Sequence, residues 1–156
     1  MKQTPVEIIE YQPQYQADFM RLNLAWIEKY FIVEDIDRQL LERPGEEIIA
    51  PGGTVLLAQL DGAVVGTAAM VKLDDGVFEL SKMSVDETLQ GRGIGRALLN
   101  AAVDWARAQD AREVVLETNT ILGPAIHLYE SVGFEAFEDD ALSHYERVNL
   151  RMRKVL

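Results

Sequence analysis

A short segment rich in glycine and arginine is the part of this sequence whose residue types most directly indicate chemistry. It consists of Gln90, Gly91, Arg92, Gly93, Ile94, Gly95 and Arg96. A run suited to a β-strand precedes it, and apolar residues at helical spacing follow it up to Trp105. The first turn of a helix has unpaired N–H groups and a positive dipole end, both of which favour an anion. Because the glycines leave the backbone accessible and the arginines add positive charge, the segment is predicted to bind phosphate.

The two commonest nucleotide-phosphate motifs are absent, which narrows the kind of ligand expected. A P-loop needs Gly-Lys-Ser or Gly-Lys-Thr, and the sequence has neither. The dinucleotide pattern G-x-G-x-x-G fails in both frames, because Arg96 and Leu98 stand where the last glycine is required. Glycines before a helix also form turns that bind nothing, so these residues alone leave a phosphate loop and a plain turn both open.

Two further features make the pattern more specific. The loop has the form Gln90-x-x-Gly93-x-Gly95 after a strand that contains Glu79, and Tyr129-Glu-Ser-Val-Gly-Phe134 comes later. With these features the chain resembles the GCN5-related N-acetyltransferase (GNAT) family, whose pyrophosphate loop reads Gln/Arg-x-x-Gly-x-Gly/Ala and whose later helix carries a tyrosine close before a Gly-Phe pair. The resemblance covers nearly the whole chain and implies acetyl-CoA as co-substrate. It says little about the acceptor.

The resemblance assigns the acetyl-CoA contacts to three places in the chain. Residues 90–96 would hold the pyrophosphate, and the backbone of Met83, Ser84 and Val85 would pair with the pantetheine arm and face the thioester carbonyl. Asn119 matches a polar side chain that the family places after the next strand. The chain departs from the family at Leu122, where many members have a further asparagine.

Acyl transfer to an amine requires two proton transfers. An amine with a pKa near 10 is protonated at neutral pH, so a base must take its proton, and the departing thiolate must receive one. Glu79 lies eleven residues before Gln90, the same interval as the base glutamate of family members that have one. Tyr129 matches the family tyrosine that protonates the thiolate. The alternatives are a Glu79 that faces solvent or pairs with Lys82, and a Tyr129 ring that only packs on the sheet.

The acceptor site of this family is walled by the first helix and the turn after it. The residues expected to contact the acceptor are Trp26, Tyr30, Phe31 and Glu34 in that region, and His144 near the end of the chain. Aromatic rings beside carboxylates can bind a cation, so a small cationic amine is the expected acceptor. The alternative is that these are core aromatics beside a solvated acidic face.

The composition indicates a single globular domain over residues 1–156. Of the 156 residues 48% are hydrophobic, yet no stretch approaches the roughly 18 apolar residues of a membrane span, and the amino terminus lacks the apolar core of a signal peptide. A cytoplasmic protein is therefore expected. The net charge of −11 disfavours nucleic acid and membrane partners and would attract a cationic acceptor, or it only keeps the protein soluble. The expected partner is a small-molecule amine, and a homodimer is left open.

The absence of cysteine limits the mechanism. It excludes disulfides, thiolate metal sites and a cysteine acyl-enzyme, and no other metal-ligand cluster is apparent in the sequence. Direct transfer within a ternary complex is therefore expected. Two rivals stay open: acetylation of a protein's N-terminal or lysine amine, and a non-catalytic acyl-CoA-binding module. Retention of both Glu79 and Tyr129 argues against the second rival.

The elements that must position these residues follow an α/β (α+β) pattern. Strands are expected over residues 4–11, 54–60, 63–71, 78–85, 112–118, 134–137 and 144–152. Helices are expected over residues 14–30, within 31–41, and over 94–105 and 125–131. A short helical turn is expected over 46–49 and an acidic turn over 138–140. Asp61-Gly62 predicts a hairpin, and the strand-helix-strand order around the glycine loop predicts one parallel pair. We therefore expect a mixed, mostly antiparallel sheet of six to seven strands with helices on both faces.

Overall fold

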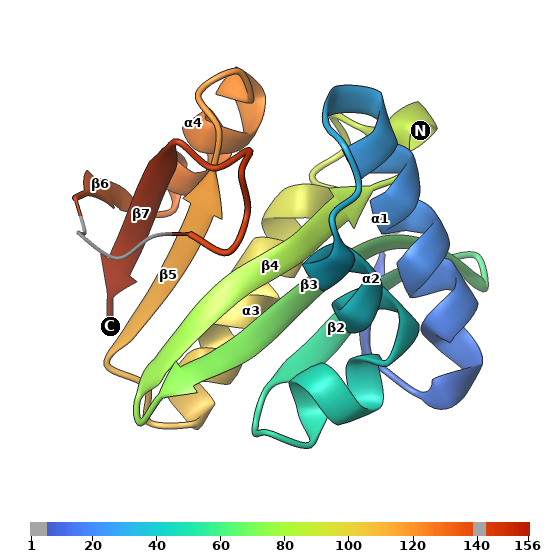
Figure 1. Ribbon diagram of the computed structural model, residues 1–156. Helices are drawn as coiled ribbons and strands as arrows, with labels where there is room; N and C mark the ends of the chain where they lie inside the picture. The colour runs from blue at the N-terminus through green and yellow to red at the C-terminus, as the bar shows by residue number, and fades with distance from the viewer. Residues whose placement is uncertain (1–5, 139–142) are drawn as a thin grey trace.

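A mixed sheet organises the molecule. The computed structural model describes residues 6–138 and 143–156. Its strands are β1 (Glu7–Glu10), β2 (Thr54–Leu60), β3 (Ala63–Asp74), β4 (Val77–Val85), β5 (Glu113–Thr118), β6 (Glu135–Phe137) and β7 (Leu150–Val155). The seven strands lie in the order β1-β2-β3-β4-β5-β7-β6, and β4 and β5 are the one parallel pair among the described residues. The predicted mostly antiparallel sheet is confirmed (Figure 1).

Helices cover both faces of the sheet, as the sequence predicts. They are α1 (Gln16–Tyr30), α2 (Asp35–Glu42), α3 (Ile94–Ala108) and α4 (Gly123–Ser131), with short helical turns η1 (Pro13–Tyr15), η2 (Gly45–Ile49) and η3 (Glu87–Leu89). Helices α1 and α2 pack on one face, and α3 and α4 pack on the other (Figure 1).

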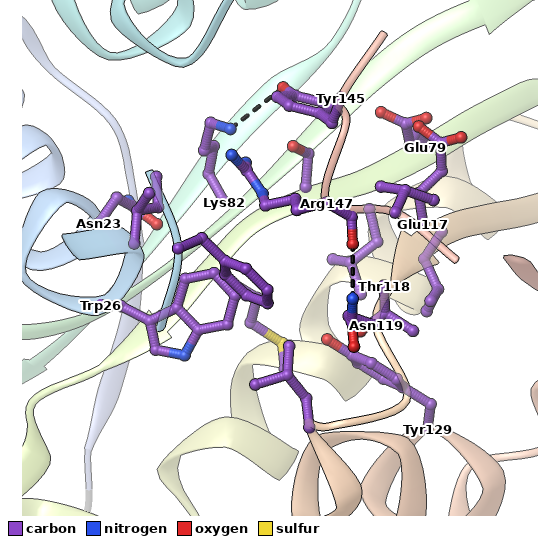
Figure 2. Close-up of a pocket in the computed structure, with 18 residues that line it drawn as sticks. Asn23, Trp26, Glu79, Lys82, Glu117, Thr118, Asn119, Tyr129, Tyr145 and Arg147 are labelled. Carbon is purple, nitrogen blue, oxygen red and sulfur yellow. Dashed lines mark hydrogen bonds between the residues drawn. The ribbon is translucent and has the colours of Figure 1, made fainter. Parts of the chain in front are cut away.

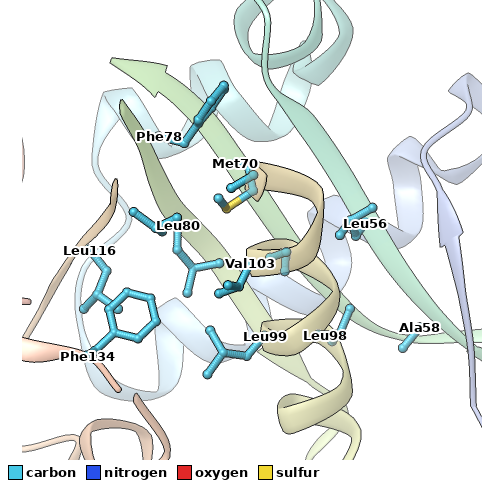
Figure 3. Packing of buried hydrophobic residues seen from close by; sticks show 14 of the residues in the cluster. Leu56, Ala58, Met70, Phe78, Leu80, Leu98, Leu99, Val103, Leu116 and Phe134 are labelled. Carbon is cyan, nitrogen blue, oxygen red and sulfur yellow. The ribbon is translucent and has the colours of Figure 1, made fainter. Parts of the chain in front are cut away.

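Two apolar clusters fix the helices to the sheet. On the α3 face, the cluster includes Leu80, Leu98, Leu99, Val103, Leu116 and Phe134 (Figure 3). On the opposite face it includes Phe19 and Ile27 of α1, Leu41 of α2, and Val55 and Leu57 of β2. Each fully buried side chain of this size stabilises the fold by about 1.5–3 kcal/mol. Because Leu80 and Leu116 belong to β4 and β5, the α3-face cluster also holds the parallel pair in place.

The turns follow the local chemistry of their residues. Asp61 and Gly62 have φ angles of 49° and 82°, and positive φ at both central residues is the signature of a type I′ hairpin turn. The turn therefore joins β2 to β3 as a tight antiparallel hairpin, as predicted. Gly76, with φ 76°, lies in the turn that leads from β3 into β4.

The carboxyl-terminal strand differs from the prediction. A strand was expected over residues 144–152, whereas β7 spans Leu150–Val155. The reason is that the preceding segment is bound across the end of β5. The Asn119 side-chain amide donates to the Arg147 carbonyl at 2.7 Å, and the Asn149 N–H donates to the Thr118 carbonyl at 3.0 Å.

Smaller differences concern the ends of the chain and the acidic turn. Residues 4 and 5 of the predicted first strand lie outside the described residues, and within the described residues the strand begins at Glu7. Two residues of the predicted acidic turn, Asp139 and Asp140, lie outside the described residues. In the described part of the chain, no helix has the length and apolar character that crossing a bilayer would require.

Candidate active site

The site begins where β4 and β5 separate. The two strands pair only over Val77–Leu80 and Glu113–Leu116, although β4 continues to Val85 and β5 to Thr118. Beyond the paired part, the backbone of β4 that faces β5 has no partner strand among the described residues. An unpaired strand edge is a template for an extended ligand that carries amide groups.

A bulge in β4 lies at the same point. Thr67 of β3 is opposite Ser84, but Ala69 is opposite Ser81, so β4 has one residue more than β3 over this interval. Lys82 accommodates the extra residue with φ 50°, a conformation that non-glycine residues rarely adopt. The Thr67 hydroxyl donates to the Lys82 carbonyl at 2.8 Å, and the Asn23 amide donates to the Thr67 hydroxyl at 2.9 Å. These buried hydrogen bonds hold the bulge in a fixed conformation.

Two pockets open on the gap and share a wall. The larger, which we call the loop groove, has a volume of about 430 Å³ and extends from Met83–Val85 to the glycine loop and α4. The smaller, the inner pocket, has a volume of about 80 Å³ and contains Glu79 and Glu117. Trp26, Met83, Leu122 and Tyr129 line both pockets. A ligand that fills the groove would therefore end beside the inner pocket.

The glycine loop supplies an uncapped helix end to the groove. Gly91 and Gly93 have φ angles of 82° and 81°, which explains glycine at both positions, and a Cβ at either would meet no atom within 4 Å. Helix α3 begins directly after Gly93, and within the part of the chain that the structure describes no side chain caps its first N–H groups. Arg96 also lines the groove. Open backbone, free N–H groups and a cation together fit a phosphate ester.

The predicted loop residues divide between the groove and the surface. Gln90, Gly91, Gly93, Ile94, Gly95 and Arg96 line the groove, whereas Arg92 is exposed and is not among the lining residues. A Cβ at Gly95 would lie 3.4 Å from Leu128 of α4, which is an ordinary van der Waals contact. The space around this position therefore does not by itself require glycine.

Glu79 lies in the inner pocket as a half-buried carboxyl group. Burial, together with the neighbouring Glu117 carboxylate, raises its pKa to about 7, although Lys82 and Arg151 oppose the shift. Glu117 accepts hydrogen bonds from Arg151 Nε and from the Ser143 hydroxyl, each at 2.9 Å. Figure 2 shows Glu79 and Glu117 beside each other on one side of the pocket. A carboxyl group with a pKa near 7 is suited to exchange protons at neutral pH.

Tyr129 lies where the pocket and the groove meet. Pro124 lies in the first turn of α4, and Gly133, with φ 98°, follows the end of the helix. Tyr129 of this helix lines both the pocket and the groove. The ring packs against Phe134 at a centroid distance of 6.1 Å. Burial raises the pKa of Tyr129 to about 12, so the phenol stays protonated at neutral pH and can donate.

A buried network of charges forms the wall opposite Glu79. Arg147 binds Asp37 with two hydrogen bonds, of 2.7 and 2.8 Å, and Glu34 with one of 3.2 Å. Lys82 Nζ donates to Asp37 at 2.5 Å and to the Tyr145 hydroxyl at 3.1 Å. Burial alone would raise the pKa of Asp37, but the Arg147 hydrogen bonds and the Lys82 charge lower it to about 2.

Sequence reasoning did not find this network. It placed Glu34 among the residues that contact the acceptor and named Lys82 as an alternative partner for Glu79, and it gave Arg147 and Tyr145 no role. One signal was present in β4, where buried residues alternate through Phe78, Leu80, Lys82 and Ser84. A lysine at an inward position of such a strand requires a buried anion.

The remaining predicted residues lie at several places around the two pockets. Trp26 and Phe31 line the inner pocket, and Tyr30 lines the loop groove. Asn119 lines the inner pocket rather than the groove, and Glu34 is bound to Arg147 and lines neither. His144 is exposed and is also absent from both linings, because the segment turns Tyr145 inward instead.

Comparisons with known proteins agree with the geometry. Residues 8–134 match the model of the acetyltransferase (GNAT) family. N-acetylaspartate synthetase of Rattus norvegicus is 40% identical over 96 residues, which are 61% of this chain and 31% of that protein. The Xenopus tropicalis protein of the same name is 40% identical over 117 residues, 74% of this chain and 37% of its own length. The chain thus spans about a third of the length of these relatives.

A solved structure shows the same fold. An acetyltransferase of the GNAT family from Staphylococcus aureus Mu50 superposes with a TM-score of 0.88, at 22% identity, over 97% of this chain and 99% of that one. The family match covers most of the chain, and it includes β4, the glycine loop and Tyr129. The chain therefore belongs to the acetyltransferase (GNAT) family.

Proposed function

We propose that the protein transfers the acetyl group of acetyl-CoA to a primary amine, directly and without a covalent enzyme intermediate. The observation that carries the proposal is the shared wall of the two pockets. Tyr129 and Met83 belong both to the groove that ends in the phosphate-binding loop and to the pocket that contains Glu79. A thioester in the groove would thus meet an amine in the pocket beside a proton acceptor and a proton donor.

The residues suggest an order of proton transfers. Glu79 takes a proton from the acceptor ammonium, directly or through water, because its pKa of about 7 leaves part of it ionised at neutral pH. The neutral amine attacks the thioester carbon, and a backbone N–H of the bulged part of β4 stabilises the developing oxyanion. When the C–S bond breaks, the Tyr129 hydroxyl donates its proton to the thiolate, and the proton that the attacking nitrogen still carries passes through water to the Tyr129 phenolate, which leaves a neutral amide. The proton held by Glu79 then leaves to solvent.

The size of the inner pocket limits the size of the acceptor. Its volume of about 80 Å³ favours a small amine over a folded protein surface. The names of the relatives also give an N-acetylated amino acid as a product. The aromatic residues Trp26 and Phe31 are proposed to form the apolar part of the acceptor wall.

The test is a panel of amines mixed with acetyl-CoA, with release of free thiol followed over time. We expect thiol release above the background hydrolysis rate for at least one small amine, and mass spectrometry should identify the N-acetylated product. Calorimetric titration with CoA is run in parallel. Binding of CoA without acetylation of any small amine, peptide or protein would show a binding module and overturn the proposal.

A further inference from the structure

The charges of the inner pocket are divided between two sides. Lys82 and Arg147 line it together with the carboxyl groups of Glu79 and Glu117. In Figure 2 the Lys82 and Arg147 nitrogens lie on one side of the Tyr145 ring, and the two glutamate carboxyl groups lie on the other. A pocket with a positive and a negative side is complementary to a ligand that carries both charges.

The counter-ions of the two cations lie behind the pocket rather than in it. Asp37 is fully buried and Glu34 is partly buried, and neither is among the lining residues. The positive charges of Lys82 and Arg147 are therefore presented to the pocket, while their anionic partners face away from it. The Arg147 side chain, 14% exposed, is the more accessible of the two.

Arg147 keeps unused donors. A guanidinium has five N–H groups, and the bonds to Glu34 and Asp37 use both groups on Nη1 and one on Nη2. The Nε–H and the second Nη2–H have no partner among the described residues. Two adjacent N–H donors on a guanidinium match the two oxygens of a carboxylate.

Tyr145 adds a neutral donor between the two sides. Its ring lies 4.4 Å from the Arg147 guanidinium carbon and 4.7 Å from Lys82 Nζ, and its hydroxyl accepts the hydrogen bond from Lys82. Burial and the carboxylates of Asp37 and Glu79 raise the pKa of Tyr145, so the phenol keeps its proton. A buried phenol oxygen that already accepts from Lys82 can donate its hydrogen to an anion.

We propose that the acceptor is a free amino acid or a similar amine that carries a carboxylate next to its amine. The carboxylate lies against Arg147 and Tyr145, and the ammonium group lies against Glu79 and Glu117. A diamine is disfavoured, because its second charge would face the like charges of Lys82 and Arg147. This inference rests on the proposed acetyl transfer, and it replaces the purely cationic acceptor that the sequence suggested.

The experiment compares amines that differ only in the carboxylate. L-Alanine is paired with ethylamine, and L-lysine with cadaverine, and kcat/KM is measured for each with saturating acetyl-CoA. We expect the carboxylate-bearing member of each pair to be preferred by about 10²-fold or more, because a buried hydrogen-bonding site rejects analogues that leave it unpaired. Equal rates within a pair, or a preference for cadaverine, would overturn the inference and leave the acetyl transfer standing.

Variants assign the preference to the positive side. Arg147→Gln should lower the ratio of the two kcat/KM values within each pair at least about 10-fold. Tyr145→Phe keeps the ring and should lower the same ratio to a lesser extent. If Arg147→Gln does not fold, the Tyr145→Phe result tests whether the positive side causes the preference. Arg107→Gln, at an exposed side chain on α3, is the matched control and should leave the ratio unchanged. A ratio unaffected by both pocket variants would contradict the assignment.

A binding measurement separates the two proposals. If no amine is acetylated, the proposed function fails, and the CoA-loaded protein is then titrated calorimetrically with L-alanine and with ethylamine. Tighter binding of L-alanine supports the carboxylate subsite independently of catalysis. The same affinity for both ligands would exclude that subsite.

Discussion

Glu79 is proposed to accept a proton and Tyr129 to donate one, and burial raises the pKa of both side chains in a way that helps each role. Burial and the Glu117 charge raise the pKa of Glu79 to about 7, which makes the carboxyl group a better base than an exposed glutamate. Burial raises the pKa of Tyr129 to about 12, which keeps the phenol protonated and able to donate when the thiolate forms beside it. The same desolvation therefore supports a base on one side of the reaction and an acid on the other.

Glu79→Gln tests the base. We expect kcat/KM to fall about 10²-fold or more at neutral pH, because glutamine cannot take the ammonium proton, and to recover partly as the pH approaches the pKa of the amine. The measurement is kcat/KM between pH 6 and 10. A full rate across this range would mean that water or another group removes the proton.

Glu117→Gln provides the comparison for that experiment. In the wild type, kcat/KM should rise with pH at the acidic end of the range, and the midpoint of this acidic limb should lie near pH 7, the pKa of Glu79. Removing the Glu117 carboxylate removes a charge that raises this pKa, so the limb should move to lower pH. A limb that does not move would show that it reports a group other than Glu79.

Tyr129→Phe tests the acid. The hydroxyl acts as the C–S bond breaks and not in ground-state binding, so we expect kcat to fall about 10- to 10³-fold while affinity for acetyl-CoA is retained. The phenylalanine ring keeps the contact with Phe134, so the melting temperature should change little. Retention of kcat would assign Tyr129 to packing, with the thiolate protonated by water.

At this scale the sequence predicted the two proton-transfer candidates but not their surroundings. Glu79 and Tyr129 follow from local motifs at fixed spacing. The Asp37 network does not, because Lys82 and Arg147 bind Asp37 across separations of 45 and 110 residues. Only the tertiary fold brings α2, β4 and the segment before β7 together, so composition and periodicity could not show which of the acidic residues is buried.

The site is built from loops and strand ends whose backbone conformation depends on glycine residues and on Lys82, which has a positive φ angle. The β4 bulge and the glycine loop are both built on backbone with positive φ. Local signals predicted the hairpin, the parallel pair and the loop-to-helix transition, because each depends on residues close in sequence. They misplaced β7, because the alternating pattern begins at His144 while hydrogen bonds to Asn119 and Thr118 hold that stretch across the end of β5.

The paired variants Gly93→Asn and Gly93→Asp test the loop as an anion site. Both side chains have the same size, and both tolerate the left-handed conformation at φ 81° better than other residues. Only the aspartate adds a negative charge at the start of α3. We expect Gly93→Asp to weaken CoA binding in calorimetry at least about 10-fold more than Gly93→Asn does, with similar melting temperatures for the two variants. Equal affinities would show that no phosphate lies at this helix end.

For the whole molecule, the tuned carboxyl groups make stability depend on pH in two opposite ways. The pKa of Asp37 falls from 3.8 to about 2 on folding, so its ion pairs stabilise the protein by about 2 kcal/mol above pH 4, and this is lost as the pH falls toward 2. The pKa of Glu79 rises from 4.5 to about 7. Its folded state binds the proton more tightly than the unfolded chain, so ionisation of Glu79 destabilises the protein progressively between pH 4.5 and 7.

Glu79→Gln should therefore be more stable than the wild type in alkaline solution. The shift of the Glu79 pKa corresponds to roughly 3 kcal/mol above pH 7 and to nothing below pH 4.5, where the wild-type carboxyl group is protonated in both states. Urea unfolding at pH 4 and pH 8 measures the difference, with Glu135→Gln, an exposed residue on β6, as the control that should show no such gain. A variant that is less stable at pH 8 would mean that the Glu79 carboxylate stabilises the fold. The expected result, a catalytic loss with a gain in stability, is what a partly buried charge that is retained for catalysis should give.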